Sequence, residues 1–387
     1  MTEMVYGVAT PVANDPILPR WWRNVDRWSL IAVVFLFFIG LLLAMASSPP
    51  LAESNQKSHF YYVYRQTFFG SVSLVIMVII SMLPIAFVRR ISIAGFSLCV
   101  VALLLLPIFG TDYGKGAVRW YSLIGLSIQP SEFLKPCFVV FTGWMMKSAF
   151  DLTTMPGRLL SFFSAVIIAA TLALQPDFGQ ASLVLGVWVV MYFVSGASIF
   201  LLVTVVLGIG LSGFFAYLNS EHVRERIDGF LVAEVNPLTQ IGYATNAIME
   251  GGYLGVGLGE GAVKWDLPDA HTDFIIAVAA EEYGLLLCLL IILIFMFVVS
   301  RSLLRLTRET AIFVRLSGVG IASLLAMQAI VNMGVAVRLL PAKGMTLPFI
   351  SYGGSSLLAM GFMMGLLFAF TRNRPQNDFE DILGRGV

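Results

Sequence analysis

Residues 29–46 read SLIAVVFLFFIGLLLAMA and contain no charged side chain. A run of this length and apolarity can cross the hydrocarbon core of a bilayer as a helix. In hydrocarbon, backbone groups must bond inside their own segment, so a helix is the expected structure. A polar segment precedes the run, which distinguishes it from a cleavable signal peptide. The stretch therefore predicts a helical membrane protein.

Similar apolar runs recur along the whole chain. Of its 387 residues, 58% are hydrophobic and 12% charged, whereas soluble proteins carry about 25% charged residues. We therefore predict an all-α, polytopic integral membrane protein with about ten transmembrane helices. The predicted spans are residues 29–46, 68–88, 91–109, 134–150, 159–174, 180–195, 197–218, 273–300, 311–337 and 352–371.

An even number of spans places both termini on one side of the membrane. Short loops rich in Lys and Arg stay in the cytoplasm, and the group Arg301, Arg305, Arg308 and Arg315 is the clearest example. Both termini are therefore predicted to be cytoplasmic. The predicted units are a cytoplasmic N-terminal segment, a transmembrane domain and a cytoplasmic C-terminal tail, at residues 1–28, 29–371 and 372–387.

Three longer segments then face outward, at residues 110–133, 219–272 and 338–351. The largest, 219–272, lies between the seventh and eighth predicted spans and is rich in charge and glycine. Loops of this size in a compact protein are usually functional or disordered. The outer face is therefore where we expect the functional residues.

Several classes of protein are excluded by composition. The net charge of +1 provides no basic surface for nucleic acid. Cys99, Cys137 and Cys288 have neither CxxC spacing nor a polar setting, so they are predicted to be buried hydrophobic residues. The glycines of residues 251–261 match a dinucleotide pattern without a βαβ unit around them. No organic cofactor is expected.

The stretch Leu267–Phe274 precedes the eighth predicted span. Asp269 and Thr272 could cap that helix, and Asp273 could benefit from its dipole. Alternatively, Asp273 beside His271 is a candidate general base at the membrane surface. A carboxylate at membrane depth is costly unless it faces a cavity or a partner, which favours a functional role.

Two further polar segments interrupt the apolar pattern. Pro130 and Ser131 favour a helix start, and Glu132 and Lys135 could pair along that helix or line a site. Upstream, Lys115, Arg119 and Trp120 place cations and an aromatic ring at the interface.

Asp177 lies in the sequence Gln175–Gln180, QPDFGQ, between two short spans. It fits a turn or a second acidic site residue. Near the last span, Arg338 and Lys343 lead into a stretch of small and hydroxyl residues that includes Ser351. That stretch could permit close helix packing or, with the two cations, cradle a phosphate.

These segments, in this order, resemble the SEDS (RodA/FtsW) family of cell-wall glycosyltransferases. The resemblance covers residues 29–371 and is closer to the cell-division members (FtsW) than to the elongation members (RodA). The matching pieces are Gly116–Trp120, Gln129–Lys135, Pro176–Gly179, Leu267–Glu282 and Lys343–Ser356, with Gly255–Gly259, Val263–Lys264 and Thr346–Pro348 favouring the division members.

The resemblance implies a peptidoglycan glycosyltransferase in the bacterial inner membrane, acting at the division septum. Its substrate would be lipid II, and its partners would be a cognate class B penicillin-binding protein and other divisome proteins. The catalytic aspartate of the family falls on Asp273. The expected binding residues are Arg119, Glu132, Lys135, Asp177, His271, Lys343 and Ser351.

In the expected reaction, Asp273 removes a proton from a sugar 4-hydroxyl, which attacks a second lipid II. Because the leaving group is undecaprenyl pyrophosphate, it needs charge stabilisation more than a proton. Cations could supply that charge, with Mg²⁺ or Mn²⁺ held through Glu132 or Asp177 as an option. A lipid II flippase and a non-catalytic divisome component are the alternatives.

Overall fold

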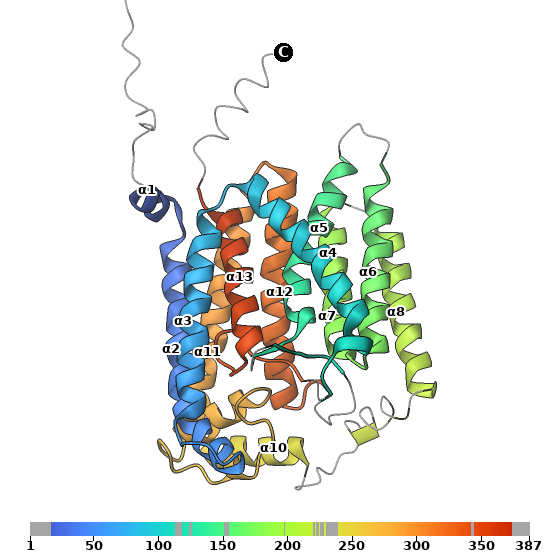
Figure 1. The fold of residues 1–387 in the computed structure, drawn as a ribbon. Coiled ribbons are helices and arrows are strands. Elements are labelled where there is room, and N and C mark those ends of the chain that lie inside the picture. The colour runs from blue at the N-terminus through green and yellow to red at the C-terminus, as the bar shows by residue number, and fades with distance from the viewer. Residues whose placement is uncertain are drawn as a thin grey trace, which may run out of the picture.

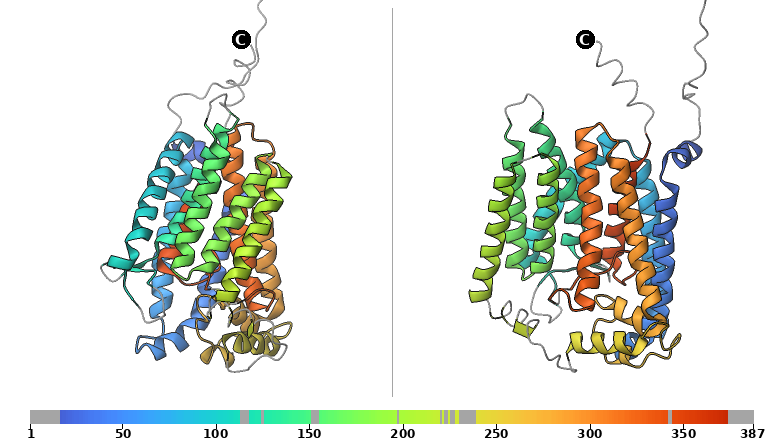
Figure 2. Two further views of the ribbon diagram at one scale, coloured as in Figure 1. Left: turned by 90° about the vertical axis from the view of Figure 1, so that its right-hand side faces the viewer. Right: turned by 180° about the vertical axis from the view of Figure 1, so that it is seen from behind.

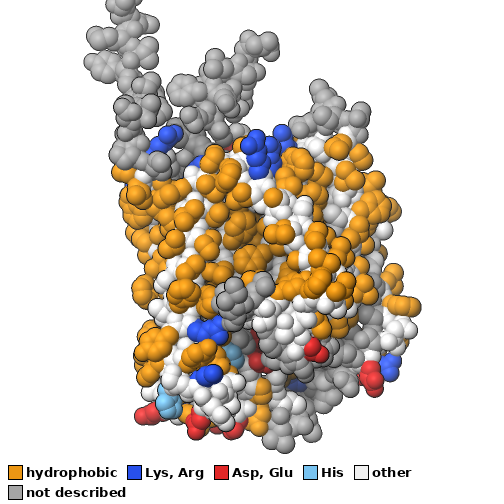
Figure 3. Space-filling view, viewed as in Figure 1, with side chains coloured by type: hydrophobic (Ala, Val, Ile, Leu, Met, Phe, Trp, Pro, Cys, Tyr) orange, Lys and Arg blue, Asp and Glu red, His pale blue; other side chains and the backbone are white. Residues whose placement is uncertain are grey.

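The computed structural model describes residues 17–112, 118–123, 126–150, 155–196, 198–219, 221, 224, 228–229, 239–341 and 344–373. Long helices stand side by side and form a bundle (Figure 1). A band of hydrophobic side chains covers the middle of the visible face, with charged side chains toward both ends (Figure 3). This is the surface expected of a protein embedded in hydrocarbon.

A helix lies at each of the ten predicted spans. They are α2 (Arg27–Ser54), α3 (Tyr61–Met82), α4 (Ile85–Phe109), α5 (Pro130–Ser148), α6 (Gly157–Leu174), α7 (Phe178–Val194), α8 (Ile199–Asn219), α11 (Ile275–Leu306), α12 (Ile312–Ala336) and α13 (Gly354–Thr371). Among the described helices, seven are long and apolar enough to cross a membrane, namely α2, α3, α4, α6, α11, α12 and α13. The number of ten crossings therefore stays a prediction.

The boundary between the second and third predicted spans was wrong. The chain leaves the helix at Leu83, where ψ is 148°, and α4 begins two residues later at Ile85. The cause is Pro84, because the residue before a proline is pushed out of the helical conformation. Arg89 and Arg90, expected in a loop, consequently lie inside α4.

Five small elements were not predicted. A helix α1 (Ile17–Asn24) lies in the N-terminal segment, and a helix α10 (Gln240–Gly251) with a 3₁₀ turn η1 (Val263–Trp265) lies in the long segment 219–272. Strands β1 (Tyr121–Leu123) and β2 (Leu126–Ile128) pair antiparallel with Tyr121 opposite Ile128. The all-α prediction is thus correct for the bundle and misses one hairpin.

Helix α13 forms the centre of the bundle and is the most buried of the candidate spans. It packs closely along α3, where a Cβ at Gly361 would lie 2.2 Å from the Ser73 carbonyl oxygen. The Ser73 hydroxyl donates to the Leu357 carbonyl at 2.6 Å. Small residues allow such close backbone approach between helices in lipid, where apolar burial alone gives little attraction. By contrast, α8 stands at the edge of the bundle (Figure 2).

The two ends of the described chain meet at one end of the bundle. The Asn373 amide donates to the Asn24 carbonyl at 3.0 Å. At the same end, the buried Asp26 carboxylate pairs with Arg301 at 2.7 Å and Arg305 at 3.1 Å. Helix α10 lies at the opposite end (Figure 1). We call that opposite end the α10 end.

Candidate functional site

Most of the predicted site residues lie toward the α10 end of the bundle, at or near helix starts. Glu132 is in the first turn of α5, Asp177 immediately precedes α7, and Asp273 lies two residues before α11. Because these helices all begin at this end, residues far apart in the sequence are brought together. Lys343 and Lys115 lie outside the described residues.

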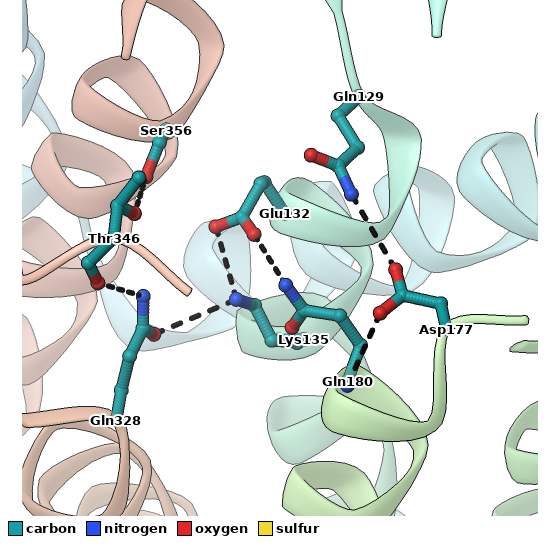
Figure 4. A network of polar contacts seen from close by, with 8 residues as sticks. All are labelled: Gln129, Glu132, Lys135, Asp177, Gln180, Gln328, Thr346 and Ser356. Atoms are coloured by element: carbon teal, nitrogen blue, oxygen red, sulfur yellow. Dashed lines mark hydrogen bonds and ion pairs between the residues drawn. The ribbon is translucent and has the colours of Figure 1, made fainter. Parts of the chain in front are cut away.

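The first cluster is centred on Glu132 and Lys135, which pair at 2.9 Å (Figure 4). Gln180 donates to the other oxygen of Glu132 at 2.7 Å. Both charged residues are buried, with 4% of Glu132 and 1% of Lys135 exposed. An ion pair this deep requires further hydrogen bonds to offset its desolvation, and Gln180 supplies one. The predicted pair along the helix is confirmed.

Asp177 lies beside this pair and caps α7. Its carboxylate accepts from the Gln180 amide at 3.4 Å and from the Gln129 side chain at 3.5 Å. Burial raises the pKa of Asp177, and the nearby Arg119 partly opposes that rise. The predicted turn is present, and the acid is also buried within the cluster.

The Arg119 side chain holds the turn before α7 by donating to the backbone of that turn. Its Nε donates to the Gln175 carbonyl at 3.0 Å, and one terminal nitrogen donates to the Pro176 carbonyl at 2.7 Å. The guanidinium has five donors, so these contacts use two of them. The side chain is half-buried.

Asp273 lies in a turn rather than in the helix. Helix α11 begins at Ile275, with Phe274 at the capping position and no side-chain cap. Capping by Asp269 and Thr272, one of the two alternatives, is not observed, because Phe274 is the capping residue and the Thr272 hydroxyl donates to the Asp269 carbonyl within the turn at 3.2 Å. The Asp273 carboxylate is half-buried, and a Cβ at Gly344 would lie 3.1 Å from its Oδ2.

Ser351 and His271 help to join this turn to the segment before α13. The Ser351 hydroxyl donates to the Thr272 carbonyl and accepts from the Leu347 amide. The Tyr352 amide donates to the His271 carbonyl at 2.9 Å, and the two rings lie 5.8 Å apart. In this conformation Ser351 therefore serves the fold rather than a phosphate.

Two amides on α12 connect the Glu132–Lys135 cluster to the Asp273 turn. Gln328 accepts from Lys135 at 3.5 Å and donates to the Thr346 carbonyl at 3.2 Å (Figure 4). One turn along, Asn332 donates to the carbonyls of Asp273, at 2.9 Å, and Met345. Both amides are almost fully buried. Helix α12 thus joins the two clusters through buried hydrogen bonds.

Gln328 and Asn332 were missed by the sequence analysis. The sequence feature that could have identified them is a pair of amides four residues apart in an otherwise apolar predicted span. At that spacing they share one helix face, and a buried polar side chain needs a partner. Gln180, a third buried amide, lies in the first turn of α7, three residues after Asp177.

A dedicated metal site is not present among the described residues, where no three His, Cys, Asp or Glu side chains come together. Both carboxylate oxygens of Glu132 are already bonded, to Lys135 and Gln180. The donor set therefore does not fit a resident metal ion in this conformation.

A helical membrane protein with buried acids, a buried lysine and paired amides toward one end belongs to the class of polytopic proteins with an intramembrane polar site. Comparison with known proteins narrows this class. Residues 27–376 match the family model FtsW/RodA/SpoVE, described as cell cycle proteins, and the chain belongs to this family.

The sequence similarity to known proteins extends over nearly the whole chain. A protein of Caulobacter vibrioides named probable peptidoglycan glycosyltransferase FtsW is 38% identical over 360 residues, 92% of each chain. A protein of Trichlorobacter lovleyi with the same name is 35% identical, over 88% of this chain and 92% of its own.

A solved structure described as coordinating polymerization and crosslinking in a peptidoglycan synthase complex has the same fold. Its TM-score is 0.73 at 25% identity, covering 89% of this chain and 97% of that one.

Proposed function

We propose that this chain is a peptidoglycan glycosyltransferase that polymerises lipid II into glycan strands during septal wall synthesis. The names of its relatives support the reaction, and the description of the family as cell cycle proteins supports the cell-division role. The observation that carries the proposal is the Asp273 turn, whose backbone is tied by Asn332 to the helix that also contacts Lys135 through Gln328. A carboxylate and a cation are thus linked across one polar site.

In the proposed reaction, Asp273 takes the proton from the 4-hydroxyl of one lipid II. The freed oxygen attacks the anomeric carbon of a second lipid II. A new glycosidic C–O bond forms while the bond to the phosphate oxygen breaks, and undecaprenyl pyrophosphate leaves with the electron pair. The half-buried setting of Asp273 offers both access for the sugar and partial desolvation for the base.

Charge on the departing pyrophosphate calls for cations placed in advance. We assign direct contact to Arg119 and Lys343. Lys135 is buried and paired with Glu132. We therefore propose that its charge contributes to the electrostatic field around the pyrophosphate without contacting it. A divalent ion such as Mg²⁺ or Mn²⁺ would arrive with the substrate phosphates, because the described acids do not form a site for it alone.

We place the α10 end on the outer face of the inner membrane and both termini in the cytoplasm. Arg301 and Arg305 near the end of α11, with Arg308 in the turn that follows, support this orientation, since positive charge at the ends of membrane helices and in short loops stays inside. The solved synthase complex supports a class B penicillin-binding protein as partner. Other divisome proteins follow from the proposed septal role.

The test uses the chain purified with its cognate penicillin-binding protein, labelled lipid II, and Mg²⁺ or Mn²⁺. We expect long glycan strands from the wild type and at least ~100-fold less polymer from Asp273→Asn, because removal of a general base costs about 10²–10⁴-fold in rate. Asp266→Asn is the matched control, an exposed carboxylate close to the same turn.

Full activity in Asp273→Asn would remove the base assignment. A folded, assembled wild-type complex that makes no polymer would instead favour the flippase, to be measured by lipid II flipping in liposomes. If both assays fail and the variant still supports division, the non-catalytic alternative is correct.

A further inference from the structure

Helix α11 is broken near its start, and a glycine-rich segment supplies hydrogen-bond partners for the backbone groups at the break. At Gly284, φ is 74° and ψ is −172°, which is not helical. The amides of Leu285 and Leu286 donate to the carbonyls of Gly252 and Tyr253, at 3.0 and 3.5 Å. Backbone groups exposed by a break need such partners in a membrane protein, so the segment 252–257 completes the helix.

The carbonyls on the other side of the break are satisfied in the same way. Glu281 accepts from the Val256 amide at 2.9 Å, and Glu282 accepts from the Gly257 amide at 3.3 Å. A Cβ at Gly255 would lie 2.1 Å from the Glu282 carbonyl oxygen. The segment therefore reaches the helix only because glycine is present at this contact.

The two acids that follow Asp273 in α11 also bind the outer segment 219–272 with their side chains, at Val263 and Lys264. Glu281 accepts from the amides of Val263 at 2.7 Å and Lys264 at 3.1 Å. The Lys264 ammonium forms an ion pair with Glu282. Lys264 is 3% exposed, Glu281 0% and Glu282 2%. These acids are therefore committed to the segment before Asp273.

The contacts of Lys264 and Glu281 lie on either side of Asp273 in the chain. Lys264 lies nine residues before Asp273 (273 − 264) and Glu281 lies eight after it (281 − 273). The chain on both sides of the aspartate is consequently clamped together, which closes residues 264–281 into a loop with Asp273 near its middle. We call this loop the Asp273 strap. Closing a loop restricts the conformations open to the residues inside it.

We infer that Lys264, Glu281 and Glu282 are positioning residues that hold the Asp273 carboxylate in place for the reaction. The inference rests on the proposed function of Asp273. Glu281 and Glu282 are not catalytic residues in this assignment, since their contacts are to the strap. A displacement of about 1 Å in a reacting group can cost ~10²-fold in rate, so even modest loosening of the clamp will be visible in turnover.

The test compares variants of the full complex with its penicillin-binding protein. Lys264→Met breaks the ion pair and leaves Glu282 charged. Lys264→Met with Glu282→Met removes both charges, so it avoids a lone buried carboxylate that could prevent folding. The swapped pair, Lys264→Glu with Glu282→Lys, restores an ion pair of reversed polarity. Glu260→Gln, an exposed acid in the same outer segment, is the control.

Two readouts are measured on folded protein. We expect the uncharged pair to lower kcat for polymerisation ~10-fold or more with KM changed less than about twofold, and the swapped pair to recover most of that loss. Amide hydrogen exchange at residues 268–274 should rise ~10-fold in the uncharged pair and stay at the wild-type rate in the control.

An uncharged pair with wild-type kcat, or with wild-type exchange at residues 268–274, would overturn the inference. A simple loss of folding would also lower the apparent kcat with KM unchanged, so kcat is expressed per folded complex, and hydrogen exchange at residues 268–274 and the recovery in the swapped pair distinguish the two causes. If the wild-type complex has no polymerase activity, the proposed function fails separately. Hydrogen exchange then still decides whether the clamp orders the strap.

Discussion

Side-chain amides hold the candidate site together at the scale of single residues. Asn332 donates from one nitrogen to two carbonyl oxygens, those of Asp273 and Met345. The orientation of the amide follows, because its oxygen would repel both carbonyls. Gln328 joins Lys135 to Thr346 one turn away. Neither amide is charged, yet each binds two segments that are distant in the sequence.

Replacing Asn332 by leucine should impair both folding stability and turnover. Two buried carbonyls lose their donor, and an unsatisfied buried polar group costs about 1–3 kcal/mol. We expect a lower thermal midpoint in detergent and ~10-fold slower polymerisation from the displaced Asp273. Ile330→Ala is the control, since Ile330 is 61% exposed on the same helix. A wild-type rate in Asn332→Leu would mean that the amide does not position Asp273.

At the scale of elements, the break in α11 is the feature on which the strap depends. A continuous helix through Gly284 would carry the Asp273 turn in another direction and leave the segment 252–257 without its partners. The break is maintained by contacts from outside the helix, namely the carbonyls of Gly252 and Tyr253. The helix and the outer segment therefore form one structural unit.

Gly284→Ala should destabilise the protein more than the same change at Gly259. Both glycines have positive φ, 74° and 84°, which costs an L-residue about 1–2 kcal/mol. At Gly284 the new Cβ would also lie 2.3 Å from the Tyr253 carbonyl oxygen, whereas nothing lies within 4 Å at Gly259. Overpacking adds about 1–3 kcal/mol.

Thermal denaturation in detergent measures this difference directly. We expect Gly284→Ala to lower the midpoint clearly more than Gly259→Ala. Equal midpoints would show that the helix can move away from the outer segment at little cost.

At the scale of the whole molecule, the two ends of the bundle differ in kind. One end joins the start of the described chain to its end, directly through Asn24 and Asn373 and indirectly through Asp26, Arg305 and Thr371. The α10 end carries the outer segment and the strap (Figure 2).

The proposed orientation predicts which end reacts with a reagent that cannot cross the membrane. In a background without the three native cysteines, Asp266→Cys should react in intact spheroplasts. Thr307→Cys should react only in inverted vesicles. Both positions are exposed and lie at opposite ends of the bundle. The reverse pattern would invert the proposed topology and remove the outward-facing site.

Much of the bundle could be predicted from the sequence, because the signal for a membrane helix is local. Each apolar run must satisfy its own backbone, so length and composition are enough to identify it. The pair Glu132 and Lys135 was accessible for the same reason, since three residues in one helix place them side by side. The end of α3 at Met82 was missed because the apolar run continues across Pro84.

The sequence by itself therefore determined where the ten apolar helices lie and that Glu132 and Lys135 lie side by side in one of them. Only the tertiary structure decided that Asn332 binds the Asp273 turn, that Lys264 pairs with Glu282, and that α11 breaks at Gly284. Contacts of this second kind join separate segments, and each depends on the direction in which several helices pack. No periodicity in the sequence indicates the direction in which helices pack, whereas the apolar runs indicate the helices themselves.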